Sequence, residues 1–217
     1  MLFRSNVLPY GKLGDQPLPC QFRNTGPSGT TPKFSCVLAD GSVVKVKYGR
    51  NPEIQAEVAA TRLLDRLGFA ADHVVIVDRL RCYGCPRYPF EATQVLTSLR
   101  SPDILPSQGF AGSYSDFTDV AVEQRFPAAA IEADAIDGWE WRELGKVTRA
   151  PAADVDALRL LAMFLAHWDN KATNQRIVCL DQTASAPTSA SGRCEDPLLM
   201  IQDLGATFGP YKANLAQ

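Results

Sequence analysis

Short runs of β-branched and aromatic residues mark the first part of the chain. Residues 33–38 and 42–48 are two such runs, and Asp40-Gly41 lies between them. An Asp-Gly pair between β-rich runs is a strong hairpin signal. The pattern therefore predicts an antiparallel hairpin here. Hydrophobic residues show little regular spacing in residues 1–26, and we expect an irregular segment there with at most one strand.

Two longer segments follow helical spacing instead. The first begins at Asn51 as N-cap with Pro52 in the first helical position, runs to about residue 67 and stops at Gly68. The second covers residues 154–166 and is apolar on nearly every side, which predicts a buried helix. Its apolar residues are Val155, Leu158, Leu160, Leu161, Met163, Phe164 and Leu165.

The remaining segments are assigned from composition and alternation. Strands are predicted at residues 73–78, 91–99, 120–126, 177–180 and 198–202. Loops are predicted at residues 101–119 (a flexible Pro/Gly/Ser-rich segment), 127–138 (a connection) and 182–192 (a low-complexity insertion).

This order predicts an α+β protein with two lobes. Residues 1–126 form a small antiparallel sheet with one helix, and residues 127–217 form a reduced, mainly helical lobe that contains a short hairpin. A chain of 217 residues can bury a sizeable core in this way.

Composition excludes several classes of partner. The formal net charge is −2, with 46% hydrophobic and 21% charged residues. We expect no nucleic-acid surface and no membrane span, because there is no basic field and no apolar run of about 18 residues. The first residues do not have the build of a signal peptide, so a cytoplasmic location is expected. A chain that is a fragment of a longer protein stays an alternative.

The six cysteines leave several possibilities open. Cys82 and Cys85 form a C-x-x-C motif, typical of a redox pair or half of a zinc site, and no second such motif is present. A zinc site, a local disulfide and unpaired thiols are the alternatives, and unpaired thiols are favoured. An even number of cysteines is weak evidence for disulfides in a chain of this length.

The strongest chemical signal lies near the C-terminal end. Residues 167–174 read His-Trp-Asp-Asn-Lys-Ala-Thr-Asn, which matches the H-x-D-x-x-x-x-N pattern at every fixed position, and Asp203-Leu204-Gly205 follows. Asp169 is the candidate carboxylate that would orient the attacking hydroxyl or take its proton. Asn174 and Asp203 are the candidate Mg²⁺ ligands, since this hard ion prefers oxygen.

A second group of candidates belongs to the first lobe. Lys45 and Lys47 share one face of their strand, because strand side chains alternate. Lys47 is the preferred nucleotide-binding lysine and Lys45 its rival. Glu57 on the following helix is the preferred partner for that lysine, with Glu53 as the alternative.

A stretch of small residues precedes the hairpin. Residues 27–33 read Pro-Ser-Gly-Thr-Thr-Pro-Lys. Small residues allow backbone N–H groups to approach phosphates, so Ser28 and Gly29 are candidate phosphate-binding residues.

Together these motifs resemble the atypical branch of the protein-kinase-like superfamily. The S-G-x-x-P-K segment at residues 28–33 is similar to the phosphate loop of HipA-type bacterial kinases. Lys47-Tyr48-Gly49 followed by Glu57 is similar to phosphoinositide kinases, and residues 167–174 are closer to ordinary protein kinases.

The resemblance implies a two-lobed kinase-like fold and assigns a role to each candidate. Ser28 and Gly29 would contact phosphates. Lys47 would hold ATP, and Glu57 would orient Lys47. Asp169 would be catalytic with Lys171 near the transferred phosphate, and Asn174 and Asp203 would bind Mg²⁺. His167 would brace the loop.

Two departures from the family pattern matter. No G-x-G-x-x-G is present, and only 14 residues follow Asp203, with Leu204 in the usual place of Phe.

The expected function is phosphoryl transfer from ATP to a hydroxyl, on a protein more readily than on a small molecule. A nucleotide-binding module without transfer activity is the alternative, and chance motifs in a structural protein are the third interpretation.

Overall fold

The computed structural model divides the chain into two compact units. The first contains Met1–Ile54 and His73–Arg125, and the second contains Gln55–Asp72 and Phe126–Gln217. Whether these units are the two predicted lobes stays a prediction. The structure describes residues 8, 15–25, 29–98, 112–131, 138–147, 151–180, 194 and 196–209.

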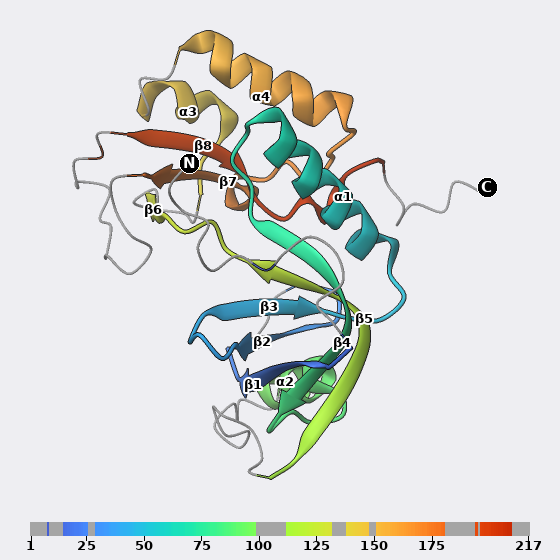
Figure 1. Cartoon of the computed structure of the whole chain (residues 1–217). Coiled ribbons are helices and arrows are strands. Elements are labelled where there is room, and N and C mark those ends of the chain that lie inside the picture. The colour runs from blue at the N-terminus through green and yellow to red at the C-terminus, as the bar shows by residue number, and fades with distance from the viewer. Residues whose placement is uncertain are drawn as a thin grey trace, which may run out of the picture. The chain divides into compact units, whose positions relative to one another are not determined.

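A closed barrel of five strands forms the first unit (Figure 1). The strands follow one another around the barrel in the order β1-β2-β3-β5-β4. Each pair is antiparallel except β1 and β4, which are parallel and close the barrel. The predicted sheet is therefore present, but it is closed and not wholly antiparallel. The bounds are β1 Leu18–Arg23, β2 Lys33–Val37, β3 Val43–Lys47, β4 His73–Tyr83 and β5 Tyr114–Gln124.

The barrel interior is filled by one face of each strand. On β3, Val44 and Val46 are buried in this core, while Lys45 and Lys47 lie on the opposite face, as alternation requires. The predicted hairpin is confirmed, with Lys33 opposite Lys47 in the register. Other core residues are Phe22, Phe34, Leu38, Val75, Val77, Leu80, Val120 and Val122.

Helix α1, Pro52–Leu67, confirms the first predicted helix and its caps. Asn51 accepts a hydrogen bond at Oδ1 from the N–H of Glu53, and its carbonyl accepts one from Ile54. Gly68 has a φ of 84°, the left-handed conformation in which glycine ends a helix without a Cβ penalty.

The predicted strand at residues 91–99 is wrong. Residues Pro89–Ser98 form helix α2, which begins with Pro at the first position and Glu91 in the first turn. Phe90 and Thr93 are buried at helical spacing. Thr93 also donates from Oγ1 to the carbonyl of Pro89, so a β-branched residue is accommodated within the helix.

Two loop predictions also need correction. Strand β5 begins at Tyr114, inside the segment 101–119 that was expected to be flexible, and residues 101–111 lie outside the described part. Strand β6, Ala129–Ile131, lies in the expected connection 127–138. The insertion 182–192 also lies outside the described residues.

A three-stranded antiparallel sheet, in the order β6-β7-β8, organises the second unit. Strand β7 is Gln175–Cys179 and β8 is Pro197–Ile201, close to the two strands predicted there. Ile177 and Cys179 pack with Leu144 of helix α3 (Trp141–Val147) and Val155 of helix α4 (Ala152–Phe164). Val178 belongs to a separate cluster with Ala70 and Met200, so successive residues of β7 serve two clusters.

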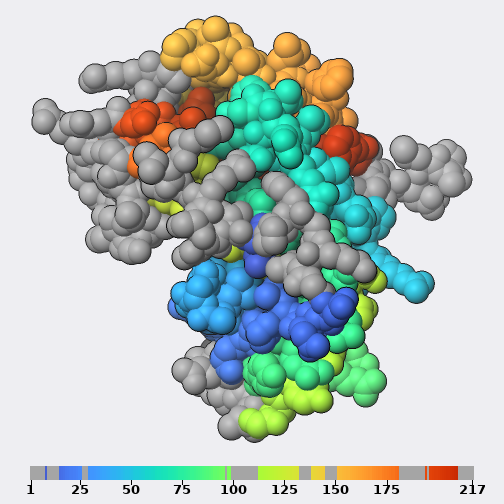
Figure 2. All heavy atoms as spheres, in the orientation of Figure 1, coloured from blue at the N-terminus to red at the C-terminus, as the bar shows by residue number. Residues whose placement is uncertain are grey.

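Helix α3 is Trp141–Val147 and α4 is Ala152–Phe164. Helix α4 packs through Leu158 and Ala162 against Ala60 and Leu64 of α1. The prediction that this helix is buried on all sides is wrong. Leu160, Met163 and Phe164 are 67%, 77% and 83% exposed, and the space-filling view places α4 at the surface of its unit (Figure 2).

The protein is thus a mixed α/β structure, with sheets and helices in both parts of its sequence. Within the described residues, each helix is too short or too polar to cross a bilayer.

Four of the six cysteines form disulfides that the sequence did not indicate clearly. Cys20 pairs with Cys36, and Cys179 pairs with Cys194. Cys82 and Cys85 are buried and form no disulfide, so the local disulfide considered for the C-x-x-C motif is wrong in this structure.

Candidate active site

The predicted catalytic loop starts where α4 ends. Ala166 has a φ of 49°, a left-handed residue that turns the chain out of the helix. The N–H of His167 donates to the carbonyl of Ala162, and the N–H of Trp168 donates to the carbonyl of Ala206. The loop is therefore attached both to α4 and to the segment that follows Asp203.

His167 is buried, with only 3% of its surface exposed. Thr207 donates its single hydroxyl hydrogen to the carbonyl of Leu204, and its Oγ1 lies 3.3 Å from Nδ1 of His167. Because the hydroxyl hydrogen is already used, Nδ1 must be the donor in this contact, and Nε2 carries a lone pair.

Burial lowers the pKa of His167, while the nearby carboxylates of Asp169 and Asp203 act in the opposite direction. The imidazole is therefore neutral at pH 7. The same electrostatics indicate that both carboxylates lie near this ring. The bracing role expected for His167 agrees with its burial and its contact with Thr207.

Asp169 and Lys171 form an ion pair. Lys171 Nζ lies 2.8 Å from Oδ2 of Asp169, and the carboxylate remains 31% exposed. An exposed carboxylate beside a cation can accept a hydroxyl proton or a hydroxyl hydrogen bond.

Asn174 connects the loop to the strand that leads to Asp203. Its Nδ2 donates to the carbonyl of Asp169 at 2.9 Å, and its own carbonyl accepts from the N–H of Gln202 at 2.7 Å. The second bond continues the β7–β8 register, in which Gln175 faces Ile201. The three predicted residues Asp169, Asn174 and Asp203 are thereby brought together at one end of this hairpin.

Asp203 has left-handed backbone angles, φ 55° and ψ 59°. Such angles are uncommon for non-glycine residues, although Asp tolerates them better than most. The residue stands between the end of β8 and the short 3-10 helix Leu204–Ala206, whose residues are buried. The turn therefore separates a partly exposed carboxylate from a buried backbone.

Gly138 and Trp139 contact the backbone at the end of the predicted catalytic loop. The N–H of Trp139 lies 3.1 Å from the carbonyls of both Ala172 and Gln175. A Cβ on Gly138 would lie 2.0 Å from the carbonyl oxygen of Ala172, so only glycine fits there. Gln175 is buried, and its amide, oriented to match donors with acceptors, bonds the carbonyls of Lys171 and Trp139.

A hollow with a volume of about 810 Å³ opens beside the loop. Lys171 of the ion pair forms part of its wall. The remaining lining residues are Glu140, Trp141, Arg142, Arg159, Ala162, Met163, Asn170, Ala172 and Gln175.

The two candidate lysines, Lys45 and Lys47, both lie near Glu123 of β5, which was not among the residues predicted from the sequence. Lys45 Nζ lies 2.5 Å from Oε1 of Glu123, and Lys47 Nζ lies 3.7 Å from Oε2. Lys47 is 1% exposed and Lys45 is 28% exposed at the side chain. An acidic residue in the apolar run of β5 needs a partner, and that was the available signal.

Glu53, the alternative to Glu57, forms hydrogen bonds within its own unit. Thr31 Oγ1 donates to Oε2 of Glu53, and Asn51 Nδ2 lies 3.4 Å from the same oxygen. This contact ties the predicted phosphate loop to the start of α1. Glu57 is buried, and its carbonyl accepts from Thr61 Oγ1. Its pairing with Lys47 stays a prediction.

The predicted phosphate loop is described in part. Ser28 lies outside the described residues. Gly29 is exposed and has a φ of 86°, a conformation that favours glycine, and Lys33 Nζ lies 3.2 Å from the position of a Cβ. The role of both residues in binding phosphate stays a prediction.

The donor set of the second unit fits a magnesium ion. Because Nδ2 of Asn174 is committed to Asp169, Oδ1 is the end left to accept, and within the described residues nothing donates to it. With the Asp203 carboxylate it would supply two oxygen ligands, and Mg²⁺ commonly takes one or two carboxylates from protein. Asn174 as a residue is 4% exposed.

Comparisons with known proteins do not establish a family. No family model matches the sequence, and no curated protein matches it. Among solved structures, the chain is similar to a Helicobacter pylori proinflammatory kinase, CtkA, with 11% sequence identity and a TM-score of 0.45. The match covers 93% of this chain, which spans 62% of the length of that protein's chain. A likeness of this degree assigns neither fold nor function.

Proposed function

We propose that this chain is a phosphotransferase that uses ATP and Mg²⁺ and passes the γ-phosphate to a hydroxyl acceptor. One observation carries the proposal: Asn174 bonds the backbone of both Asp169 and Gln202, so two candidate metal ligands and a candidate catalytic carboxylate share one hairpin end. Phosphoryl transfer depends mainly on such positioning and on neutralising charge.

Each residue of the second unit then has a role. Asn174 Oδ1 and Asp203 would hold Mg²⁺, which supplies charge neutralisation at the phosphates. Asp169 orients the acceptor hydroxyl and takes its proton, since its carboxylate is partly exposed. Lys171, paired with Asp169 at 2.8 Å, contributes a cation beside the transferred group. Neutral His167 holds the loop and carries no proton transfer.

The nucleotide-binding lysine and the phosphate loop of this proposal belong to the first unit. Lys47 is preferred over Lys45, because a lysine that is 1% exposed and shares Glu123 is held in a fixed position. Ser28 and Gly29 would offer backbone N–H groups to phosphates. Glu57 would orient Lys47.

We place the acceptor in the hollow beside the loop. Lys171 lines it, and the Asp169 carboxylate lies 2.8 Å from that amine. Its volume of about 810 Å³ is within the usual range for a ligand site, and Trp141 and Arg159 give it aromatic and cationic walls. A protein segment bearing a hydroxyl side chain is the acceptor we favour.

A transfer assay with radiolabelled ATP tests the proposal. We expect Asp169→Ala to lower transfer at least about 10²-fold, as is typical when a general base is removed. ATP with Mg²⁺ should still raise the melting temperature of this variant, since Asp169 is not a metal ligand in the proposal. Asp154→Asn, which changes an exposed acid in the first turn of α4 in the same unit, is the matched control.

Two outcomes would contradict the proposal. If Asp169→Ala transfers phosphate at the wild-type rate, Asp169 has no part in the reaction. If the wild type is stabilised by ATP but transfers nothing, to itself or to added proteins, the chain is a nucleotide-binding module instead.

A further inference from the structure

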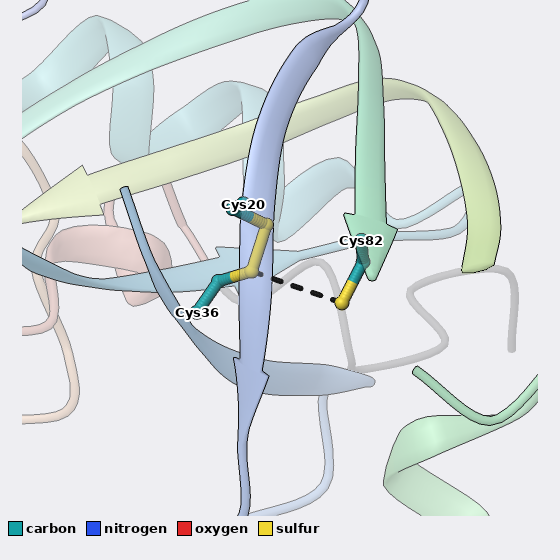
Figure 3. A group of neighbouring side chains, drawn as sticks. All are labelled: Cys20, Cys36 and Cys82. Carbon is teal, nitrogen blue, oxygen red and sulfur yellow. Dashed lines mark hydrogen bonds between the residues drawn. A yellow bond between two sulfur atoms is a disulfide. The ribbon is translucent and has the colours of Figure 1, made fainter. Parts of the chain in front are cut away.

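Four cysteines meet in the barrel of the first unit. Cys20 of β1, Cys36 of β2 and Cys82 of β4 point toward one another from neighbouring strands (Figure 3). Their three sulfur atoms lie within 4.8 Å of one another, and all three side chains are buried. The fourth, Cys85, belongs to the same core cluster.

The strand register explains how the group forms. Cys20 lies directly opposite Cys82 in the parallel β1–β4 pair. Cys36 lies opposite Phe22, two positions from Cys20 on the antiparallel side, and forms the disulfide with Cys20. Strand β1 lies between β2 and β4 in the barrel, so Cys20 is next to one cysteine on each neighbouring strand.

Cys82 and Cys85 remain thiols beside this disulfide. Hydrogen bonding with Cys85, and then burial, raise the pKa of the Cys82 thiol. Cysteines pack well as small apolar residues, which accounts for the burial of each. It does not account for the grouping of four of them from three separate segments.

The distance between one pair of these sulfurs, from β2 and β4, is close to that between two ligands of a tetrahedral thiolate site. Cys36 Sγ and Cys82 Sγ are 3.7 Å apart. Tetrahedral zinc with Zn–S bonds of about 2.3 Å places its sulfur ligands about 3.8 Å from one another. The C-x-x-C motif supplies two ligands at the spacing common in such sites, and the fold supplies the second pair that the sequence lacks as a motif.

We propose that Cys20, Cys36, Cys82 and Cys85 form a binding site for one Zn²⁺ ion, closed by the Cys20–Cys36 disulfide and opened by its reduction. A dithiol reductant gives up two electrons and two protons, becomes a disulfide, and leaves Cys20 and Cys36 as thiols. The four thiols then release four protons as one Zn²⁺ binds to four thiolates. The site is independent of the proposed phosphotransfer.

Cobalt binding tests this site on the full chain. Tetrahedral Co²⁺ thiolate has intense visible absorption, so reduced wild-type protein should develop these bands with one Co²⁺ per chain and lose them when Zn²⁺ is added. The protein with its disulfide intact should develop none. Cys82→Ala and Cys85→Ala should each weaken Co²⁺ affinity at least about tenfold.

The matched control is Cys179→Ala with Cys194→Ala, which removes the other disulfide, in the second unit. This control should keep the bands when reduced. Circular dichroism of every sample separates loss of metal binding from loss of folding. Folded, reduced wild type without bands would overturn the proposal. So would bands that persist after Cys82→Ala with Cys85→Ala, or bands lost in the control. If reduction unfolds the chain and metal does not restore folding, the proposal also fails.

Discussion

Side-chain burial separates the two candidate lysines more clearly than their sequence positions do. Both lie beside the same carboxylate of Glu123, yet the Lys47 side chain is 1% exposed and the Lys45 side chain is 28% exposed. The partners of Glu123 could not be chosen from the sequence, because it meets Lys45 only through the pairing of β3 with β5, 78 residues apart. Asp169, Lys171 and Asn174 could be chosen, since they occupy one short segment.

The lysines can be distinguished by substitution. We expect Lys47→Met to weaken ATP binding about tenfold or more, the loss that follows removal of a charged hydrogen bond to phosphate. Lys45→Met should change ATP affinity much less. Lys47→Met should also lower the free energy of unfolding, by less than the roughly 3–5 kcal/mol of an uncompensated buried charge, because Lys45 still pairs with Glu123. Calorimetric titration with ATP and urea unfolding measure the two effects. Equal ATP affinities of the two variants would contradict the assignment.

His167 predicts a specific dependence of stability on pH. Its pKa is lowered in the folded protein, so the unfolded chain binds the extra proton first as the pH falls. Above about pH 6.5, the ordinary pKa of histidine, both states are neutral and this contribution is flat. Below that value the free energy of unfolding should fall, by at most about 1.4 kcal/mol per pH unit for one proton.

The variant His167→Asn isolates this contribution, because Asn can still donate to Thr207. In urea unfolding between about pH 5 and 7.5 without metal, the variant should lose stability less steeply than the wild type as the pH falls. Parallel curves would show that His167 takes up its proton equally in both states.

At the scale of elements, local signals predicted the hairpin, α1 and the β7–β8 pair. The error at α2 arose because its Thr and Val residues favour strands by propensity, while Pro89 and the burial of Phe90 and Thr93 select a helix. The error at α4 arose because an apolar residue pattern does not specify which face is covered. Strand β6 has only three residues and gives almost no periodic signal.

The contact of Gly138 with the catalytic loop gives a prediction at this scale. In Gly138→Ala, the new Cβ would lie 2.0 Å from the carbonyl oxygen of Ala172, so the short helix Ala172–Asn174 must move. We expect transfer activity to fall about 10²-fold, since a displacement of about 1 Å at a catalytic group has that effect. Gly68→Ala is the control, because Gly68 has nearly the same φ but nothing within 4 Å of its Cβ position. Steady-state rates and melting temperatures of both variants are the measurements. Equal activity would remove Gly138 from the support of the site.

For the whole molecule, the predicted site residues are divided between the two compact units. Lys47 and Gly29 belong to the first unit, while Glu57, Asn174 and Asp203 belong to the second. Helix α1 contributes to both, because the boundary falls between Ile54 and Gln55. Sequence motifs identify such residues one segment at a time and contain no information about the distance between segments. This is why the second-unit candidates can be joined by hydrogen bonds here while the pairing of Lys47 with Glu57 stays a prediction.

Two disulfides are also a property of the whole chain. Such bonds persist in oxidising compartments and are rare in reducing ones. The cytoplasmic location expected from the sequence therefore stays a prediction.

Magnesium dependence of nucleotide binding is the most direct test of the account. Calorimetric titration with ATP, with and without Mg²⁺, should give tighter binding with the metal for the wild type and for the control Asp154→Asn. In Asp203→Ala the enhancement by Mg²⁺ should disappear, because the carboxylate that holds the ion is gone. If Asp203→Ala binds ATP with the same Mg²⁺ enhancement as the wild type, Asp203 is not a metal ligand and the proposed site is wrong.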